Sequence, residues 1–307
     1  MSISAQMVKE LRLKSSAGMM DCKKALTETN GDMDAAIDWL RKKGLATASK
    51  KAGRVASEGL IGIKLKNKSG AIVEVNSETD FVARNEEFQT FVNDICNIAL
   101  ENNADLNKIL SSNFPGSSKN VQDTLTDKIA KIGENMSLRR AEMLSVTNGA
   151  VIGYIHNSVK DDLGKIGVLV ALESNADASQ LNKLGKELAM HIAATSPSSL
   201  SIEDLSSELV DRERKVLIDQ AMSSGKPEEI AKKMVEGRLR KFYSEVVLLE
   251  QIFVIDGETK VSDVIKKFSK EINKDIKINS FIRFNLGEGI EKDTKNFADE
   301  VADQLSD

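Results

Sequence analysis

Apolar side chains recur at helical spacings through the first 45 residues. They fall in three runs: Val8, Leu11 and Leu13; Met20, Cys22 and Leu26; and Met33, Ala36, Ile37 and Leu40. Gly18, Gly31 and Gly44 punctuate the runs, so the pattern predicts three short helices, with Trp39 in their core. A bundle this small buries little apolar surface, which favours a semi-independent module followed by a small, basic linker.

The periodicity changes from helical to alternating after the linker. Residues 59–66 and 71–76 alternate, are rich in β-branched side chains and are joined by a Lys-Asn-Lys-Ser-Gly turn, which predicts a β-hairpin. A helix with Phe88, Val92 and Ile95 on one face follows, then a second helix near 121–132 and a strand at 136–146. The order is hairpin, helix, helix, strand.

The same order returns in the second half of the chain. A hairpin is expected at 149–155 and 165–172, a helix at 178–194, a further helix at 261–272 and a strand at 276–286. Gly59 and Gly62 of the first hairpin resemble Gly149 and Gly153 of the second. We interpret this order as an internal duplication.

Two long helical stretches, 202–222 and 228–249, interrupt the second copy and are separated by Ser-Ser-Gly-Lys-Pro. This pattern predicts a helical hairpin. Its thin apolar stripe is expected to hold Leu205, Leu209, Val216, Ile230 and Met234. A hairpin so rich in charge should project into solvent, either as a salt-bridged surface element or as an arm that reaches a partner.

Together these elements predict an α+β fold. It comprises an N-terminal three-helix module, two similar core subdomains with small antiparallel sheets packed against helices, and an inserted helical hairpin. The expected boundaries are 1–45 for the module, 46–58 for the basic linker, 59–147 for the first core subdomain, 148–196 and 250–290 for the second, 197–249 for the hairpin, and 291–307 for an acidic C-terminal helix or tail.

Composition narrows the class of protein. The 307 residues contain 43 Lys and Arg against 47 Asp and Glu, a net charge of 43 − 47 = −4, which excludes a basic nucleic-acid packaging protein. The two cysteines, Cys22 and Cys96, lack metal-ligand spacing and favour a reducing compartment. The start of the chain lacks a leader pattern and the apolar runs are short, so we expect a soluble, cytoplasmic protein.

An enzyme interpretation finds little support in the sequence. His156 and His191 lie near no recognised nucleophile motif, and neither phosphate-cradling glycine pattern is present, so no catalytic residue, bound nucleotide, cofactor or metal is expected. Cys22 beside Lys23 and Lys24 could be a thiol of lowered pKa, but its spacing to Leu26 favours a buried thiol on a helix face.

The most informative local segment is Glu74-Val-Asn-Ser-Glu-Thr-Asp-Phe-Val-Ala-Arg84, at the corner between a hairpin strand and its helix. Structurally, Thr79 or Asp80 could cap the helix, and Phe81 could point inward with Phe88. The equivalent corner of the second copy, 174–178, keeps capping residues and has no aromatic. Capping therefore does not require Phe81, and an exposed aromatic beside a carboxylate would suit insertion into another protein.

These residues carry a resemblance to a known family, elongation factor Ts. The matching segments span nearly the whole chain and occur in the family's order: Val8–Arg12, Ala17–Leu26, Glu74–Arg84, Lys131–Asn135, Ile166–Val170, Ala189–Ala194, Ser224–Pro227, Met234–Arg238, Phe281–Phe284 and Gly287–Lys292. The resemblance implies an N-terminal module like a ubiquitin-associated domain and a coiled-coil arm.

The resemblance also implies a function. Family members are guanine-nucleotide exchange factors that bind elongation factor Tu, in its GDP-bound and nucleotide-free forms, in translation. By resemblance, Thr79, Asp80, Phe81 and Val82 form the segment that dislodges Mg²⁺ from the partner, with Phe81 as the wedge and Asp80 acting on the ion directly or by positioning Phe81.

Secondary contacts to the partner are implied at Met19, Met20, Lys23 and His156. The residues themselves leave alternatives open, because the methionines could fill the three-helix core and His156 could satisfy local hydrogen bonds. No nucleic-acid or membrane partner is expected.

Two other classes of function compete with nucleotide exchange. A catalytically inert adaptor or ribosome-associated module would use the basic N-terminal helices and the arm, and should tolerate the change Phe81→Ala. An enzyme would require turnover that depends on His156 or His191, which we do not expect.

Overall fold

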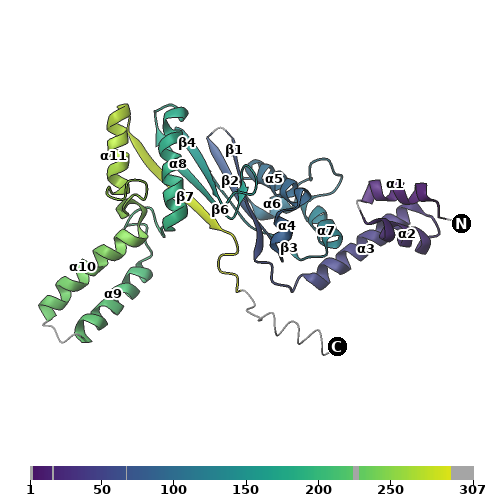
Figure 1. The fold of residues 1–307 in the computed structure, drawn as a ribbon, viewed down its shortest axis with the longest axis horizontal. Helices are drawn as coiled ribbons and strands as arrows, with labels where there is room; N and C mark the ends of the chain where they lie inside the picture. The colour runs from purple at the N-terminus through teal and green to yellow at the C-terminus, as the bar shows by residue number, and fades with distance from the viewer. Residues whose placement is uncertain (1–2, 16, 67, 224–227, 292–307) are drawn as a thin grey trace. The chain divides into compact units, whose positions relative to one another are not determined.

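The computed structural model describes residues 3–15, 17–66, 68–223 and 228–291 (Figure 1). These residues form helices and two small antiparallel sheets, so the predicted α+β class is confirmed. The chain divides into two compact units. The first contains Met1–Gly62, Val73–Ala141 and Asn285–Asp307, and the second contains Ile63–Ile72 and Glu142–Phe284. The expected acidic tail, 291–307, lies outside the described residues except for residue 291.

Three helices form the small N-terminal bundle that the periodicity predicts: α1 (Ala5–Ser15), α2 (Met19–Glu28) and α3 (Met33–Lys51). Their core holds Leu11, Cys22, Ala25, Leu26 and Ala36. The core position expected for Trp39 is wrong. Its ring is partly buried at the margin, where Lys43 Nζ lies 5.6 Å from the ring centre. Helix α3 also runs on through 46–51, so the first part of the expected linker is helical.

Cys22 is fully buried in this core, with its Sγ atom 3.8 Å from the carbonyl oxygen of Ala17. Cys96 is buried as well, and neither cysteine forms a disulfide bond. The interpretation of Cys22 as a helix-face thiol is therefore confirmed. The reactive-thiol alternative is wrong, because a nucleophilic thiolate needs access to its reaction partner.

The first sheet has the strand order β3-β2-β1-β5. Its strands are β1 (Glu58–Lys66), β2 (Ser69–Ser77), β3 (Met136–Ser145) and the short β5 (Leu163–Gly164). Between β2 and β3 the chain forms α4 (Asp80–Ala83), α5 (Glu86–Glu101), α6 (Leu106–Ser111) and α7 (Val121–Ile132). The predicted hairpin, α5, α7 and β3 are confirmed, whereas α4, α6 and β5 were not predicted.

The second sheet has the order β4-β6-β7, with bounds Gly149–His156, Ile166–Ser174 and Ile276–Asn285. Strands β4 and β6 pair antiparallel, from Gly149 opposite Glu173 to His156 opposite Ile166. Helices α8 (Ala178–Thr195) and α11 (Val261–Ile272) and the 3-10 helix η1 (Leu248–Glu250) complete this subdomain. Leu184, Leu188 and Ile192 of α8 pack with the sheet in one apolar core.

The geometry of the two hairpins supports the inferred duplication. In each sheet the third strand pairs with the second strand of the hairpin. Gly59 and Gly149 open the two hairpins with φ angles of 121° and 125°, and a Cβ atom would lie 2.2 Å from the Val75 oxygen in one and 1.9 Å from the Leu172 oxygen in the other. The same close approach of two strands therefore requires glycine at both positions.

Helices α9 (Ser207–Ser223) and α10 (Glu228–Val246) form the predicted hairpin and lie side by side (Figure 1). Its expected turn, after Ser223, lies outside the described residues. The expected apolar stripe is largely wrong: Leu209, Val216 and Ile230 are 38%, 44% and 50% exposed. The buried contacts between the helices come instead from Leu217, Ala221, Val235 and Leu239.

His191 has a structural position at the base of this hairpin. Its ring is buried on α8, with Nε2 2.9 Å from Gln251 Oε1, while Nδ1 accepts a hydrogen bond from the Val254 amide at 3.2 Å. These partners fix a neutral ring that carries its proton on Nε2. Gln251 Nε2 in turn donates to the Glu245 carbonyl at 2.7 Å, so the side chain of Gln251 joins α8 to the end of α10.

We predict that His191 makes stability depend on pH. Burial lowers the pKa of His191 from 6.5, although the Gln251 hydrogen bond opposes this shift. The unfolded chain therefore binds a proton more readily, and stability should fall as pH drops below about 6.5, by up to about 1.4 kcal/mol per unit. Urea unfolding at pH 7.5 and 5.5 should show a smaller pH effect in His191→Gln.

The exposed histidine provides the control for this comparison. His156→Gln removes the other imidazole of the chain, from an exposed strand end, and is measured alongside. An unchanged pH dependence in His191→Gln would contradict the prediction.

Candidate functional site: the corner after strand β2

The predicted site is a tight corner in the first unit. Strand β2 ends at Ser77, and α4, a single helical turn, begins at Asp80. Phe81 is 76% exposed, whereas the next side chain, Val82, is 5% exposed and packs inward. The alternative in which Phe81 joins the core is therefore wrong. The corner presents an aromatic ring to solvent and is anchored beneath by Val82.

Thr79 occupies the N-cap position of α4, but its side chain does not act as the expected cap. Its Oγ1 donates to Glu134 Oε1 at 2.7 Å, and its backbone amide donates to Glu134 Oε2 at 3.0 Å. The capping interpretation is wrong because this carboxylate, which follows α7, engages the hydroxyl. Glu134 lies within the family motif Lys131–Asn135, but the sequence pattern assigned it no role.

Asp80 stands beside Phe81 and retains access to solvent. Its Oδ2 atom accepts from Arg84 Nη2 at 2.9 Å, one helical turn on, and its side chain is 42% exposed. Exposed ion pairs at this spacing contribute little to stability. The carboxylate can therefore exchange this contact for a partner at small cost.

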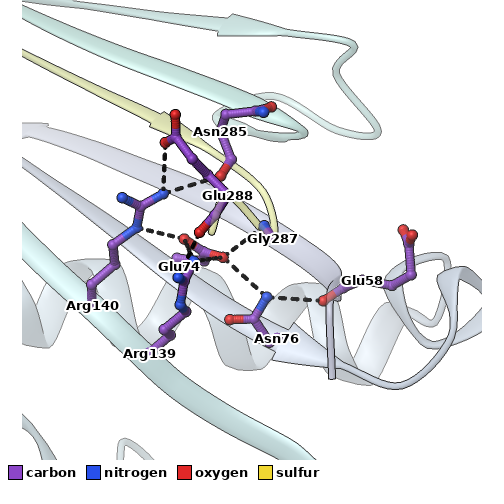
Figure 2. Close-up of polar contacts among 8 residues, drawn as sticks. All are labelled: Glu58, Glu74, Asn76, Arg139, Arg140, Asn285, Gly287 and Glu288. Carbon is purple, nitrogen blue, oxygen red and sulfur yellow. Dashed lines mark hydrogen bonds and ion pairs between the residues drawn. The ribbon is translucent and has the colours of Figure 1, made fainter. Parts of the chain in front are cut away.

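Strand β2 carries a second, buried carboxylate, which Figure 2 shows. The side chain of Glu74 has no exposed surface. It accepts from Arg140 Nε at 2.6 Å, Arg139 Nη1 at 3.1 Å, Asn76 Nδ2 at 3.0 Å and the Gly287 amide at 2.9 Å. These donors come from β3, from β2 itself and from the turn after β7, so one side chain joins three segments of the first unit.

The two arginines extend the contact to the turn after β7 (Figure 2). Arg139 Nη2 donates to the Glu288 carbonyl at 2.6 Å, and Arg140 Nη2 donates to the Asn285 carbonyl at 3.0 Å. Burial alone would raise the pKa of Glu74, but hydrogen bonds from Gly287, Arg140 and Asn76 and the charge of Arg140 outweigh it and hold that pKa below 4.5. Glu74 therefore stays ionised near neutral pH.

The N-terminal bundle presents Met19, Met20 and Lys23 to solvent. Met19 is 60% and Met20 74% exposed, so the alternative in which they fill the three-helix core is wrong. They line an open hollow of about 630 Å³ together with residues of α1 and of the chain before it. The lining residues are Ile3, Ala5, Val8, Lys9, Arg12, Met19, Met20 and Lys23. The lining therefore combines apolar side chains with the basic Lys9, Arg12 and Lys23.

His156 lies in the second unit, exposed at the end of β4. Its Nδ1 atom lies 3.0 Å from the Tyr154 hydroxyl. The local hydrogen bond that the sequence left open as an alternative is therefore present, and the ring remains accessible.

Metal ligation and membrane crossing find no support in the described part of the chain. Among the described residues, no group of three or more His, Cys, Asp or Glu side chains is arranged to hold a metal ion. No helix in the described ranges has both the length and the apolar character that crossing a membrane demands.

Comparison with known proteins tests the resemblance. A family model described as "Elongation factor TS" matches residues 78–288. "Elongation factor Ts" of Rhodospirillum centenum is 60% identical over 300 residues, which cover 98% of each chain. The protein of that name from Parvibaculum lavamentivorans is 58% identical over 98% of this chain and 97% of its own, and that from Bartonella henselae 54% over 98% of each.

The fold and these matches define the class of protein as a factor of translation elongation. Because the family model covers more than half of the chain and the relatives cover nearly all of it, the chain belongs to the elongation factor Ts family. The family suggested by the sequence motifs is confirmed.

We predict that Glu74→Gln destabilises the first unit by about 3 kcal/mol, because Arg139 and Arg140 lose the buried carboxylate that they share, although Arg140 keeps its 3.4 Å ion pair with Glu288. Its pH dependence should change as well. Since the pKa of Glu74 is lowered in the folded state, its stabilising contribution is lost as pH falls below 4.5. Urea unfolding at pH 7 and pH 4 should show a smaller loss on acidification in the variant.

The matched control is Glu87→Gln, which breaks an exposed ion pair with Lys131 in the same unit. It should change the free energy of unfolding by less than about 1 kcal/mol. Equal stability of Glu74→Gln and the wild-type protein at pH 7 would contradict the structural importance of the buried carboxylate.

Proposed function

We propose that this protein is a guanine-nucleotide exchange factor that binds elongation factor Tu in its GDP-bound form and promotes release of GDP, so that GTP can bind during translation elongation. Membership of the elongation factor Ts family supports the proposal. The observation that carries it is the 76% exposed ring of Phe81, held on a one-turn helix beside a partly exposed carboxylate.

The proposed mechanism acts on the ion that holds GDP. Mg²⁺ bridges and neutralises phosphate oxygens and requires a near-octahedral set of ligands, so a small displacement of its surroundings weakens nucleotide binding. In this proposal Phe81 inserts into the partner and shifts one of its helices. Asp80 disturbs the neighbourhood of the ion by charge or hydrogen bonding, while Thr79 and Val82 shape the corner.

Reversibility follows from linkage between the two ligands of the partner. If the exchange factor lowers the affinity of the partner for GDP by some ratio, then bound nucleotide lowers the affinity of the partner for the exchange factor by the same ratio. Incoming GTP therefore displaces the protein and completes the cycle. The protein catalyses no covalent step in this scheme and binds no nucleotide itself.

Further contacts with the partner are proposed at Met19, Met20 and Lys23, and more weakly at His156. The exposed methionines and the basic side chains that line their hollow support the first group, since flexible thioethers adapt to an opposing protein surface. The accessible ring of His156 is compatible with the second. A role in translation supports a cytoplasmic location for the protein.

We predict that Phe81→Ala abolishes most of the exchange activity while leaving the fold intact. Loss of a central aromatic anchor removes on the order of 2 kcal/mol or more, which corresponds to roughly a thirtyfold slower release of GDP. Release of labelled GDP from purified elongation factor Tu measures this effect, and circular dichroism checks the fold of the variant.

Ile255→Ala serves as the matched control, because it truncates a side chain that is 50% exposed in a loop of the second unit. It should exchange GDP at the wild-type rate. An adaptor without exchange activity predicts equal behaviour of both variants, and unfolding of Phe81→Ala would mean that the ring supports the core.

A further inference from the structure

The corner that carries Phe81 is fastened by a distant carboxylate. Glu134 uses one oxygen for the Thr79 hydroxyl, at 2.7 Å, and the other for the Thr79 amide, at 3.0 Å. It follows Gly133, which ends α7 in the left-handed region with a φ of 84°. That residue turns the chain out of the helix just before the carboxylate.

A second contact joins the same two segments, the corner after β2 and the chain after α7. Here the acceptor lies in the corner and the donor lies after α7. The carboxylate of Glu78 accepts from the Asn135 amide at 2.5 Å, and it also pairs with Arg54 at 3.3 Å. Asn135 Nδ2 donates to the Arg54 carbonyl at 2.7 Å. We call the contacts of Glu78, Thr79, Glu134 and Asn135 the corner clamp.

A clamp matters at this corner because α4 is too short to hold itself. A helical turn of four residues fixes many dihedral angles for one or two hydrogen bonds, so it is unstable alone. Its start at Thr79 is held by Glu134, and its inner face is held by the buried Val82. The direction in which Phe81 projects depends on these two restraints together with the hydrogen bonds from Ser77 Oγ to the Thr79 carbonyl, at 3.0 Å, and from Gln89 Nε2 to the Ala83 carbonyl, at 3.1 Å.

We propose that Glu134 is a positioning residue of the exchange site, which acts through Thr79 to keep α4 folded and Phe81 oriented before the partner arrives. This inference rests on the proposed exchange function. A side chain that is already oriented loses less conformational entropy when it inserts. The orientation of Phe81 should therefore raise the rate of the step in which nucleotide is displaced. It should leave unchanged the affinity that the partner gains from contacts with other surfaces of the protein.

The test compares Glu134→Ala, Thr79→Val and Glu134→Gln in the full-length protein. Release of labelled GDP from elongation factor Tu is measured against the concentration of the partner. Glu134→Ala should lower the maximal rate about tenfold, equivalent to about 1.4 kcal/mol, and change the half-saturating concentration by less than about twofold. Thr79→Val loses the hydroxyl bond but keeps the amide bond, and Glu134→Gln keeps one acceptor oxygen, so both should give intermediate rates.

Two measurements separate positioning from a general structural role. In the Phe81→Ala background, adding Glu134→Ala should slow exchange no further, because the residue that Glu134 positions is already gone. Amide hydrogen exchange at residues 79–83 should accelerate in Glu134→Ala. The control Glu87→Gln breaks the exposed ion pair between α5 and Lys131 of α7 and leaves the bonds of Glu134 to Thr79 in place, so it should change neither measurement.

The outcomes distinguish the two proposals. If the wild-type protein does not accelerate GDP release, the proposed function fails, and hydrogen exchange still tests whether Glu134 orders the corner. If the wild-type protein is active and folded Glu134→Ala matches it in maximal rate, the positioning role is overturned. Should Glu134→Ala fail to fold, Thr79→Val decides the question, since an unchanged maximal rate there would refute the role.

Discussion

A buried negative charge organises the first unit of this protein. Glu74 has no exposed side-chain surface, and a carboxylate can be buried only when donors replace the water that it loses. Arg139, Arg140 and the Gly287 amide supply those donors from β3 and from the turn after β7. Strand β2, which leads directly into the Phe81 corner, is hydrogen-bonded to β1 and β3 in the sheet, and Glu74 joins it in addition to the turn after β7. The contacts of Glu74 therefore help to set the position from which the corner begins.

The corner itself follows the same principle on a smaller scale. Exposed aromatic rings on short segments are mobile unless other contacts hold the backbone. Val82 anchors the turn from below, and Glu134 accepts both donors of Thr79. The second copy of the subdomain joins β6 to α8 with no aromatic, so its corner is built without such a ring. Under the proposed function, one copy of a duplicated scaffold has gained a protruding side chain and, with it, a partner-binding role.

The sequence could predict what depends on neighbours along the chain. Periodicity located the hairpins, α5, α7, α8, α11 and the duplicated order, because each is encoded within one continuous window. It could not predict the contacts of Glu74 or Thr79, whose partners lie 65 and 55 positions away. The apolar stripe predicted for the contact between α9 and α10 was largely wrong, since several faces of a charged helix can carry similar apolar stripes. The exposure of Phe81 follows from the comparison of the two copies and from the family resemblance, whereas the periodicity alone left an inward-pointing ring open.

The central claim is that the protein releases GDP by disturbing Mg²⁺ in elongation factor Tu, and one titration tests it most directly. Release of labelled GDP would be followed with substoichiometric amounts of the protein, at high Mg²⁺ and after chelation of Mg²⁺. The proposed mechanism predicts several rounds of GDP release per molecule of the protein at high Mg²⁺. It predicts a much smaller relative acceleration once the ion is removed, because chelation itself already weakens GDP binding. An equal relative acceleration under both conditions would contradict the Mg²⁺ mechanism, and no acceleration under either would contradict exchange altogether.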